Sequence, residues 1–182
     1  MTITDPFEKL VECHDHIMSR LSLFDQSLEA IEKQGVVGFL SEKENIKLMF
    51  DFIDTSIALH TRDEEEGLFP SLRPKLKAKL SSQSEGSTPV DVMEGEHRMV
   101  EGVIARMKGL ALLIEKSASS HEVVALIEEF VEKGKWLIQA YYGHIWKENN
   151  VLFPMAERLL SAQEKSEVAN VMNQLREESV PQ

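Results

Sequence analysis

Cysteine is nearly absent from this chain of 182 residues, which contains only Cys13. One cysteine cannot form a disulfide within the chain, and it cannot supply the several thiolates of a cysteine-based zinc or iron–sulfur site. Long apolar runs are also missing, since no stretch of about 18 apolar residues occurs, as a membrane-spanning helix would need. The N-terminal segment MTITDPFEKL lacks the basic region and the apolar stretch of a signal peptide. These absences predict a cytoplasmic protein without a membrane span.

Basic residues are not in excess either. The chain has 31 Asp and Glu against 20 Lys and Arg, which gives a formal net charge of −11. Nucleic acids and anionic membranes are bound by basic patches, so neither is expected as a partner. The hydrophobic share of 42% and the charged share of 28% are ordinary for a soluble globular protein. We therefore expect a single domain over residues 1–182, present as a monomer or a homodimer.

Helix-start signals are frequent, whereas no segment has a convincing strand pattern. Asp5 and Thr88 are each followed directly by a Pro, a residue that is favoured at the first position of a helix. A capping box, in which a Ser and a Glu three residues later satisfy free backbone N–H groups, is expected at Ser41, Ser119 and Ser161. These five starts predict an all-α protein.

Apolar residues recur at spacings of three and four through four long segments, as in amphipathic helices. The first helix should end near Gly35, a good left-handed stop. A short surface helix over residues 72–80 is expected before a polar loop at 81–89, and a short fifth helix over about 162–176. Four long helices with two short turns and one longer connection predict an up-down-up-down four-helix bundle, with its core over about residues 5–160.

Two copies of one string are the most informative feature of the chain. Residues 60–70 and 144–154 both read H-x3-E-x3-L-F-P. A His and a Glu four residues apart lie on one face of a helix, and a single such pair is usually an ordinary surface pair. Two copies with identical tails suggest a metal site. The Leu and Phe of each tail are expected to pack at the end of the bundle, and the charged residues Asp63, Glu65 and Glu66 are expected on a solvated face.

Four histidines each continue the apolar stripe of one predicted helix: His14, His60, His97 and His144. Buried histidines need polar partners, so four of them are unusual for a structural core. In an antiparallel helix pair, residues equally far from the turn lie at about the same level. The midpoint of the first two histidines falls in the predicted turn 35–38, and that of the last two falls in the predicted turn 117–120. We therefore expect two related helical hairpins that bring all four histidines to one level.

Four imidazoles and two carboxylates exceed what one tetrahedral zinc would use. Carboxylates can bridge two ions, and a mixed set of nitrogen and oxygen ligands suits iron, manganese or zinc. We infer a two-metal site, with two iron ions favoured and zinc or manganese as alternatives. Glu101 lies four residues after the third histidine and is a candidate further ligand, whereas Met18 at the equivalent place of the first helix would bind hard metals poorly. The candidate ligands are His14, His60, Glu64, His97, Glu101, His144 and Glu148.

The chain resembles the hemerythrin-like (HHE cation-binding) proteins. The resemblance is carried by residues 10–17, 60–70, 92–97 and 144–154. It implies a four-helix bundle that holds a non-haem di-iron centre, bridged by two carboxylates and an oxo or hydroxo group. It implies that Glu64 and Glu148 are the bridges and that the four histidines above are ligands. A small diatomic ligand, dioxygen or nitric oxide, is the partner that this resemblance implies.

Three roles stay open within this resemblance. The motifs are most similar to the branch that repairs iron–sulfur clusters under nitric-oxide stress, although its N-terminal paired-cysteine domain is not found in these 182 residues. Oxygen-carrying members have a His where this chain has Glu101. The chain is therefore expected to bind or sense dioxygen, nitric oxide or a related small ligand, with two alternatives. It could be a di-iron enzyme acting on peroxide or nitrogen oxides, or an iron donor in cluster repair. The lack of an evident general acid or base beyond Glu101 favours binding over catalysis.

Overall fold

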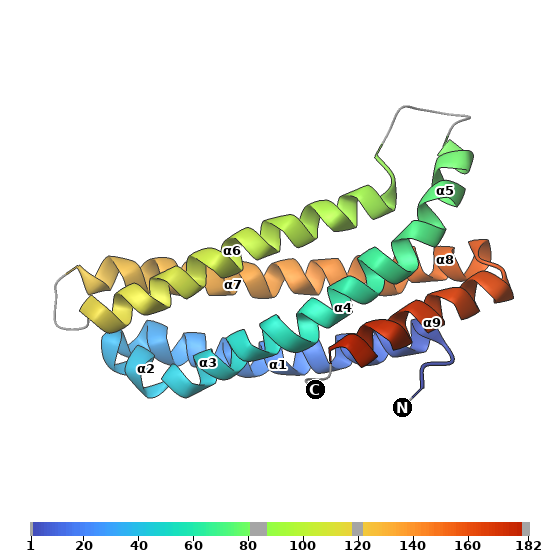
Figure 1. Cartoon of the computed structure of the whole chain (residues 1–182). Helices are drawn as coiled ribbons and strands as arrows, with labels where there is room; N and C mark the ends of the chain where they lie inside the picture. The colour runs from blue at the N-terminus through green and yellow to red at the C-terminus, as the bar shows by residue number, and fades with distance from the viewer. Residues whose placement is uncertain (1, 81–86, 118–121, 180–182) are drawn as a thin grey trace. The chain divides into compact units, whose positions relative to one another are not determined.

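The computed structural model describes residues 2–80, 87–117 and 122–179, and within these ranges the chain is helical and has no strand (Figure 1). The prediction of an all-α bundle is confirmed. The helices are α1 (Pro6–Gln34), α2 (Val36–Ser41), α3 (Lys43–Phe52), α4 (Ala58–Arg62), α5 (Phe69–Leu80), α6 (Pro89–Ser117), α7 (Val123–Lys147), α8 (Phe153–Leu159) and α9 (Ala162–Glu178). Three π-helical turns interrupt them: η1 (Ile53–Ile57), η2 (Asp63–Leu68) and η3 (Glu148–Leu152).

Three helices begin at the capping signals that the sequence predicts. Asp5 Oδ1 accepts two backbone N–H groups from the first turn of α1, at 2.9 and 3.2 Å. At α6 the capping is reciprocal, because the Thr88 N–H donates to Asp91 Oδ2 at 2.8 Å and the Asp91 N–H donates to Thr88 Oγ at 3.2 Å. At α9 the capping box of Ser161 and Glu164 is complete. Each cap satisfies N–H groups that a helix start leaves without a partner.

The predicted capping box at Ser41 is wrong. Ser41 is the last residue of α2, and its hydroxyl donates to the backbone oxygen of Gly38 at 2.9 Å. The chain does leave α1 at Gly35, which has a φ of 60° in the left-handed region, as predicted. It then forms α2 where only a turn was expected. A side chain at Gly38 would meet the backbone oxygen of Ala30 at 2.5 Å, so α2 can lie this close to α1 only with a glycine there. The signal at Ser119 lies outside the described residues.

The chain divides into two compact units. Unit 1 comprises Met1–Asp15, Thr55–His97 and His144–Gln182, and unit 2 comprises His16–Asp54 and Arg98–Gly143. The chain passes from one unit to the other four times, within α1, η1, α6 and α7. Each unit therefore receives a segment of every long helical stretch, as an up-down-up-down order requires. The assignment of residues 1–182 to a single domain stays a prediction.

The core of unit 1 is built around the two Leu-Phe tails. Leu68, Phe69, Leu152 and Phe153 are all buried, at 0–3% exposure, and they pack in one apolar cluster with side chains of α1, α5, α6, α8 and α9. Their predicted packing role is confirmed. The fifth helix, α9, contributes apolar side chains to the same cluster and contacts α4 and η2, beside which it runs in Figure 1. This packing fixes the helical segments that carry the two strings.

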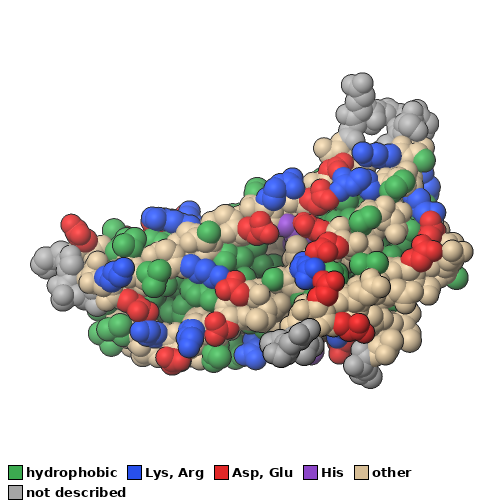
Figure 2. Space-filling model, viewed as in Figure 1, with side chains coloured by type: hydrophobic (Ala, Val, Ile, Leu, Met, Phe, Trp, Pro, Cys, Tyr) green, Lys and Arg blue, Asp and Glu red, His purple; other side chains and the backbone are tan. Residues whose placement is uncertain are grey.

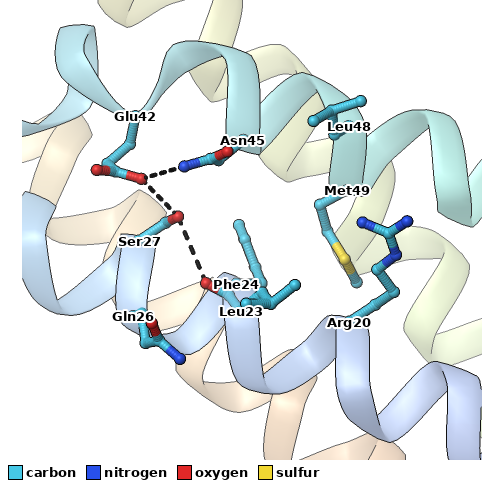
Figure 3. Close-up of a pocket in the computed structure, with 9 residues that line it drawn as sticks. All are labelled: Arg20, Leu23, Phe24, Gln26, Ser27, Glu42, Asn45, Leu48 and Met49. Carbon is cyan, nitrogen blue, oxygen red and sulfur yellow. Dashed lines mark hydrogen bonds between the residues drawn. The ribbon is translucent and has the colours of Figure 1, made fainter.

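In unit 2, one carboxylate ties the start of α3 to α1. Glu42 Oε2 accepts hydrogen bonds from Asn45 Nδ2 and Ser27 Oγ, both at 2.7 Å. These two hydrogen bonds lower the pKa of Glu42. The three polar residues line one side of a surface pocket of about 260 Å³, whose other walls include Leu23 and Met49 (Figure 3). These three polar side chains therefore hydrogen-bond to one another and join α1 to the start of α3.

The charged side chains stand mostly on the surface. Figure 2 shows one face, on which Lys and Arg side chains are interspersed among Asp and Glu side chains. Ion pairs such as Arg62–Glu66 at 2.7 Å and Lys108–Asp54 at 2.5 Å are of this exposed kind. Exposed pairs contribute little to stability, so the fold rests on its apolar core. Among the described helices, none has the length and apolar character needed to cross a membrane.

Candidate metal centre

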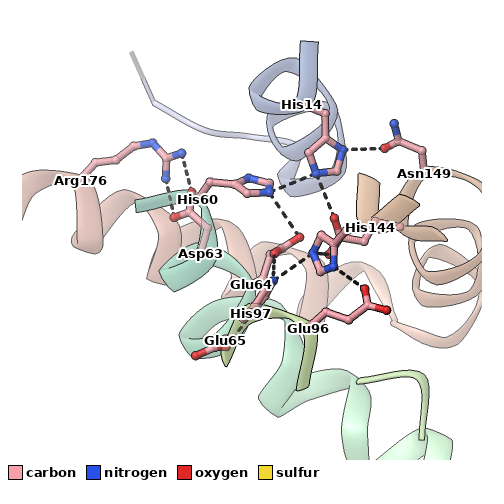
Figure 4. A network of polar contacts seen from close by, with 11 residues as sticks. His14, His60, Asp63, Glu64, Glu65, Glu96, His97, His144, Asn149 and Arg176 are labelled. Atoms are coloured by element: carbon pink, nitrogen blue, oxygen red, sulfur yellow. Dashed lines mark hydrogen bonds and ion pairs between the residues drawn. The ribbon is translucent and has the colours of Figure 1, made fainter. Parts of the chain in front are cut away.

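Six of the seven candidate ligands meet in unit 1 (Figure 4). They come from six different elements: His14 from α1, His60 from α4, Glu64 from η2, His97 from α6, His144 from α7 and Glu148 from η3. All six are buried, with exposed fractions between 0 and 9%. Two carboxylates and four imidazoles are thus removed from solvent together, and a polar cluster of this size requires partners.

Both bridging candidates lie in π-helical turns, which the sequence analysis missed. Glu64 is the second residue of η2, and Glu148 is the first residue of η3. Each π-turn ends two residues before the Pro of its string, Pro70 or Pro154. A proline has no N–H and its ring displaces the carbonyl four residues earlier, so the wider π-turn accommodates it. Single π-turns are frequent at functional sites.

The histidines form two pairs. His14 Nε2 lies 3.1 Å from His60 Nε2, and His97 Nε2 lies 3.0 Å from His144 Nε2. Each pair joins the first and second helical stretch of one hairpin. This agrees with the prediction that histidines equally far from the hairpin turn lie at the same level. All four Nε2 atoms therefore face the inside of one cluster.

Glu64 spans the two histidine pairs. Its Oε1 lies 3.7 Å from His60 Nε2, and its Oε2 lies 3.5 Å from His97 Nε2. The two oxygens of one carboxylate thus face histidines from different hairpins. A carboxylate in this position can hold one ion with each oxygen.

Glu148 repeats this arrangement from the other hairpin. Its Oε2 lies 3.2 Å from His14 Nε2, and its Oε1 lies 3.0 Å from His144 Nε2. The cluster therefore contains two groups of four possible ligands that share both carboxylates. The first group is His14, His60, Glu64 and Glu148, and the second is His97, His144, Glu64 and Glu148.

Outer hydrogen bonds fix the ring orientation of three histidines. In each case Nδ1 donates to an oxygen that can only accept, so Nε2 carries the lone pair that a metal ligand needs. These contacts are His14 with Asn149 Oδ1 at 2.8 Å, His97 with Glu65 Oε1 at 2.8 Å and His144 with Glu96 Oε2 at 2.9 Å. The buried Nδ1 of His60 has no hydrogen-bond partner among the described residues.

The inner faces of these groups lack donors. Among the described residues, none gives a hydrogen bond to the four carboxylate oxygens of Glu64 and Glu148. Imidazole lone pairs and carboxylate lone pairs therefore converge in a buried space, where unsatisfied polar atoms are costly. Cations between the two carboxylates would satisfy every one of these atoms. The donor set consequently fits two metal ions, each with two imidazole nitrogens and two carboxylate oxygens.

The shifted pKa values of these groups also reflect the cost of burying charged side chains without a cation. Burial raises the pKa of Glu64 well above its ordinary value, and the negative charge of Glu148 adds to this effect. Burial also lowers the pKa of His60 to about 3. Although burial opposes it, contacts with His14 and His144 hold the pKa of Glu148 below its ordinary value. The pKa of His144 is raised, because neighbouring carboxylates outweigh the effect of its burial. The metal-free cluster thus favours one protonated carboxylate, whereas metal ligation requires both to be ionised.

The Phe of each string stacks on a histidine of the opposite hairpin. Phe153 stacks on His14 with a centroid distance of 5.5 Å and an interplanar angle of 8°. Phe69 stacks on His97 at 6.1 Å and 9°. Besides filling the core, the tails therefore orient two ligand rings and shield them from water.

The expectation of a solvated face for the charged run is wrong at Asp63 and is confirmed at Glu65 and Glu66, which are exposed. Asp63 is fully buried, and both of its oxygens accept hydrogen bonds from Arg176 at 2.6 Å. Although it is exposed, Glu65 also accepts the hydrogen bond of His97 Nδ1. Glu65 could have been found, because it and Asn149 follow the Glu of their strings directly. The partner of Asp63 could not, because it lies 113 residues away.

The seventh candidate, Glu101, is not brought into either group. It is exposed and belongs to unit 2, where burial and the charge of Glu101 together raise the pKa of Tyr141. Met18, its counterpart on α1, is also exposed and also belongs to unit 2. Ligation by Glu101 stays a prediction.

A helical bundle with four histidines and two carboxylates buried together in its core fits a class, the helical bundles that can hold metal ions between side chains of facing helices. The family model described as the hemerythrin HHE cation binding domain matches residues 5–156 of this chain. The chain therefore belongs to the hemerythrin HHE cation-binding family. No curated protein matches it.

Proposed function

We propose that this chain binds two iron ions and uses them to bind or sense a small diatomic ligand, dioxygen or nitric oxide. The observation that carries the proposal is the position of the two buried carboxylates. Each has one oxygen facing the first histidine pair and one facing the second. Two ions held in common by two carboxylates are the simplest occupants of such a cluster.

The number of donors favours iron over zinc. Each ion would receive four protein atoms, which completes the tetrahedral set of a structural zinc site. Iron and manganese accept further ligands, so four protein donors leave room for an exogenous one. Bound iron would supply a redox-active centre with an open coordination position. The protein would supply the orientation of the imidazoles and the exclusion of water.

The enclosure of the cluster supports a small ligand. The most exposed ligand, His97, has only 9% of its surface accessible, and the two stacked Phe side chains are 1–3% exposed. A large organic substrate would have to displace this packing to reach the Nε2 atoms. A diatomic molecule needs only slight opening of the side chains. Peroxide and small nitrogen oxides meet the same size limit, so an enzyme acting on them is the second candidate.

The test is anaerobic loading of metal-free protein with Fe²⁺, followed by exposure to dioxygen or nitric oxide. A change in the absorption spectrum that reverses when the gas is removed supports ligand binding. Steady turnover of peroxide would instead favour the enzyme, and restoration of a cluster-free iron–sulfur enzyme by the loaded protein would favour iron donation. Glu148→Gln should abolish the response, whereas the exposed Glu66→Gln is the matched control. Failure of the wild-type protein to retain iron would overturn the proposal.

The remaining expectations stay part of this proposal. They are a cytoplasmic location, a monomeric or homodimeric state, and no nucleic-acid or membrane partner. The acidic net charge of −11 supports the last of these, since both partners attract basic proteins.

A further inference from the structure

The two hairpins place matching histidines and glutamates in the cluster, but the hydrogen bonds that hold the imidazole rings from outside differ between the hairpins. His97 follows His14 by 83 residues, and Glu148 follows Glu64 by 84. The residue after each bridging Glu holds the Nδ1 of the first histidine of the opposite hairpin. These residues are Glu65, which holds His97, and Asn149, which holds His14. The same geometry is thus built twice, once with an anion and once with a neutral amide.

The second outer contact exists in only one hairpin. Glu96 precedes His97 directly and accepts the hydrogen bond of His144 Nδ1 at 2.9 Å. Its counterpart, the residue that precedes His14, is Cys13. A carboxylate is therefore missing on this side, and the Nδ1 of the buried His60 has no partner among the residues that the structure describes.

The two metal positions consequently have different surroundings. At the position of His97 and His144, both imidazoles donate to carboxylates. At the position of His14 and His60, one donates to an amide and the other to none. All other inner ligands are shared, because both carboxylates belong to both groups.

A carboxylate that accepts the Nδ1–H of a ligating histidine makes its imidazole more basic and holds its ring in place. Loss of such an outer partner typically lowers metal affinity by about 10- to 100-fold. Lys147 also contacts Glu96, which reduces the net charge near His144 but leaves the hydrogen bond in place. The difference between the two positions is therefore two carboxylate partners against none.

We propose that the two metal positions are unequal, and that the position of His97 and His144 fills first while the position of His14 and His60 holds the exchangeable metal. This inference rests on the proposed function, because it concerns the same cluster. Glu65 and Glu96 are positioning residues in it, since they act through the ligands. The result is a protein with one retained and one readily lost metal ion.

The experiment is a titration of metal-free protein with Co²⁺ in competition with a chelator, followed by absorption and calorimetry. Two binding steps are expected, separated by about 10- to 100-fold in affinity. Glu65→Gln and Glu96→Gln should weaken the first step by about 10-fold or more and so narrow the separation. Asn149→Asp should do the opposite for the second step, because it gives His14 a carboxylate partner. Glu66→Gln and Asn150→Asp make the same changes one residue further on, where no ligand is contacted, and should leave both steps unchanged.

Location is tested separately, by anomalous scattering from crystals of wild-type protein loaded with one equivalent of Co²⁺. A single strong peak between His97 and His144 is expected. Two equal steps, two equal peaks, or an Asn149→Asp variant with an unchanged second step would overturn the inference while leaving two-metal binding intact. No binding of Co²⁺ or Fe²⁺ by the wild-type protein would overturn the proposed function itself. A gain in affinity at Asn149→Asp cannot come from loss of folding, so this variant separates positioning from mere stability.

Discussion

Replacing Glu64 by Gln should make the metal-free protein more stable while it destroys metal binding. Glu64 is fully buried, and both of its oxygens lack a hydrogen-bond partner among the described residues. Its pKa is raised well above the ordinary value, so the carboxylate is poorly accommodated without a cation. Gln has the same shape, carries no charge and can donate its amide hydrogens to the lone pairs of His60 or His97, which lie at 3.7 and 3.5 Å.

The magnitude follows from the cost of a buried unsatisfied polar group, about 1–3 kcal/mol. Glu64→Gln should therefore raise the free energy of unfolding of the metal-free protein by about 1–3 kcal/mol at pH 7. For a chain of this length that corresponds to a rise in Tm of about 2–12 °C. Metal affinity should fall by more than about 100-fold, because loss of an outer partner alone costs 10- to 100-fold.

The assay is thermal unfolding in the presence of a chelator, followed by circular dichroism, combined with calorimetric metal titration. Glu66→Gln is the control, since it makes the same chemical change at an exposed position two residues further on. A gain in the stability of the metal-free protein together with a loss of metal affinity would identify Glu64 as a residue that serves metal binding at the expense of stability. A less stable metal-free Glu64→Gln protein, or one that binds metal as the wild type does, would refute the reasoning.

Three further outcomes are expected. The stability of the metal-free protein should be highest between about pH 4.5 and 6.5 in equilibrium unfolding. The pKa of His60 falls from 6.5 to about 3 on folding, so its contribution is lost as the pH drops below 6.5, and the raised pKa of Glu64 means that stability is lost as the pH rises above 4.5. Between pH 4.5 and 6.5 the pH dependences due to His60 and Glu64 oppose each other. Below pH 4.5 the lowered pKa of Glu148 makes the loss of stability steeper. A flat stability profile from pH 3 to 8 would contradict this expectation. Because the pKa of Glu64 is raised in the metal-free protein and ligation requires its ionised form, metal binding should be linked to proton release, seen as a dependence of the binding enthalpy on the ionisation enthalpy of the buffer. Arg176→Met should cost about 3 kcal/mol in chemical denaturation, because it leaves the buried Asp63 without its partner, and adding Asp63→Asn should recover much of that loss.

The clustering of six candidate ligands could be predicted from the sequence because these residues follow two periodic rules. A His and a Glu four residues apart share a helix face, and equal distances from a turn place His14 level with His60. These rules depend only on helix geometry and on antiparallel packing. The helix starts at Asp5, Thr88 and Ser161 were predicted equally well, because capping is local chemistry.

The outer contacts and the irregular turns could not be predicted in the same way. A π-turn is set by the balance of backbone hydrogen bonds and by the ring of a proline several residues later, which no periodic pattern records. The pair of Asp63 and Arg176 joins residues whose positions along the chain are unrelated. α2 depends on the close approach of Gly38 to α1, which is a tertiary effect. The role of Glu96 appears only once the rings are in place, whereas Glu65 and Asn149 could have been singled out because each directly follows the Glu of its string.

The central claim is that two metal ions share Glu64 and Glu148. It is tested most directly by counting the iron bound per chain in protein that has been dialysed anaerobically to equilibrium against Fe²⁺, so that the more weakly held ion is counted as well. The account predicts close to two iron ions per chain in the wild type and less than one in Glu148→Gln. Well under one iron per wild-type chain, or two in the variant, would contradict it.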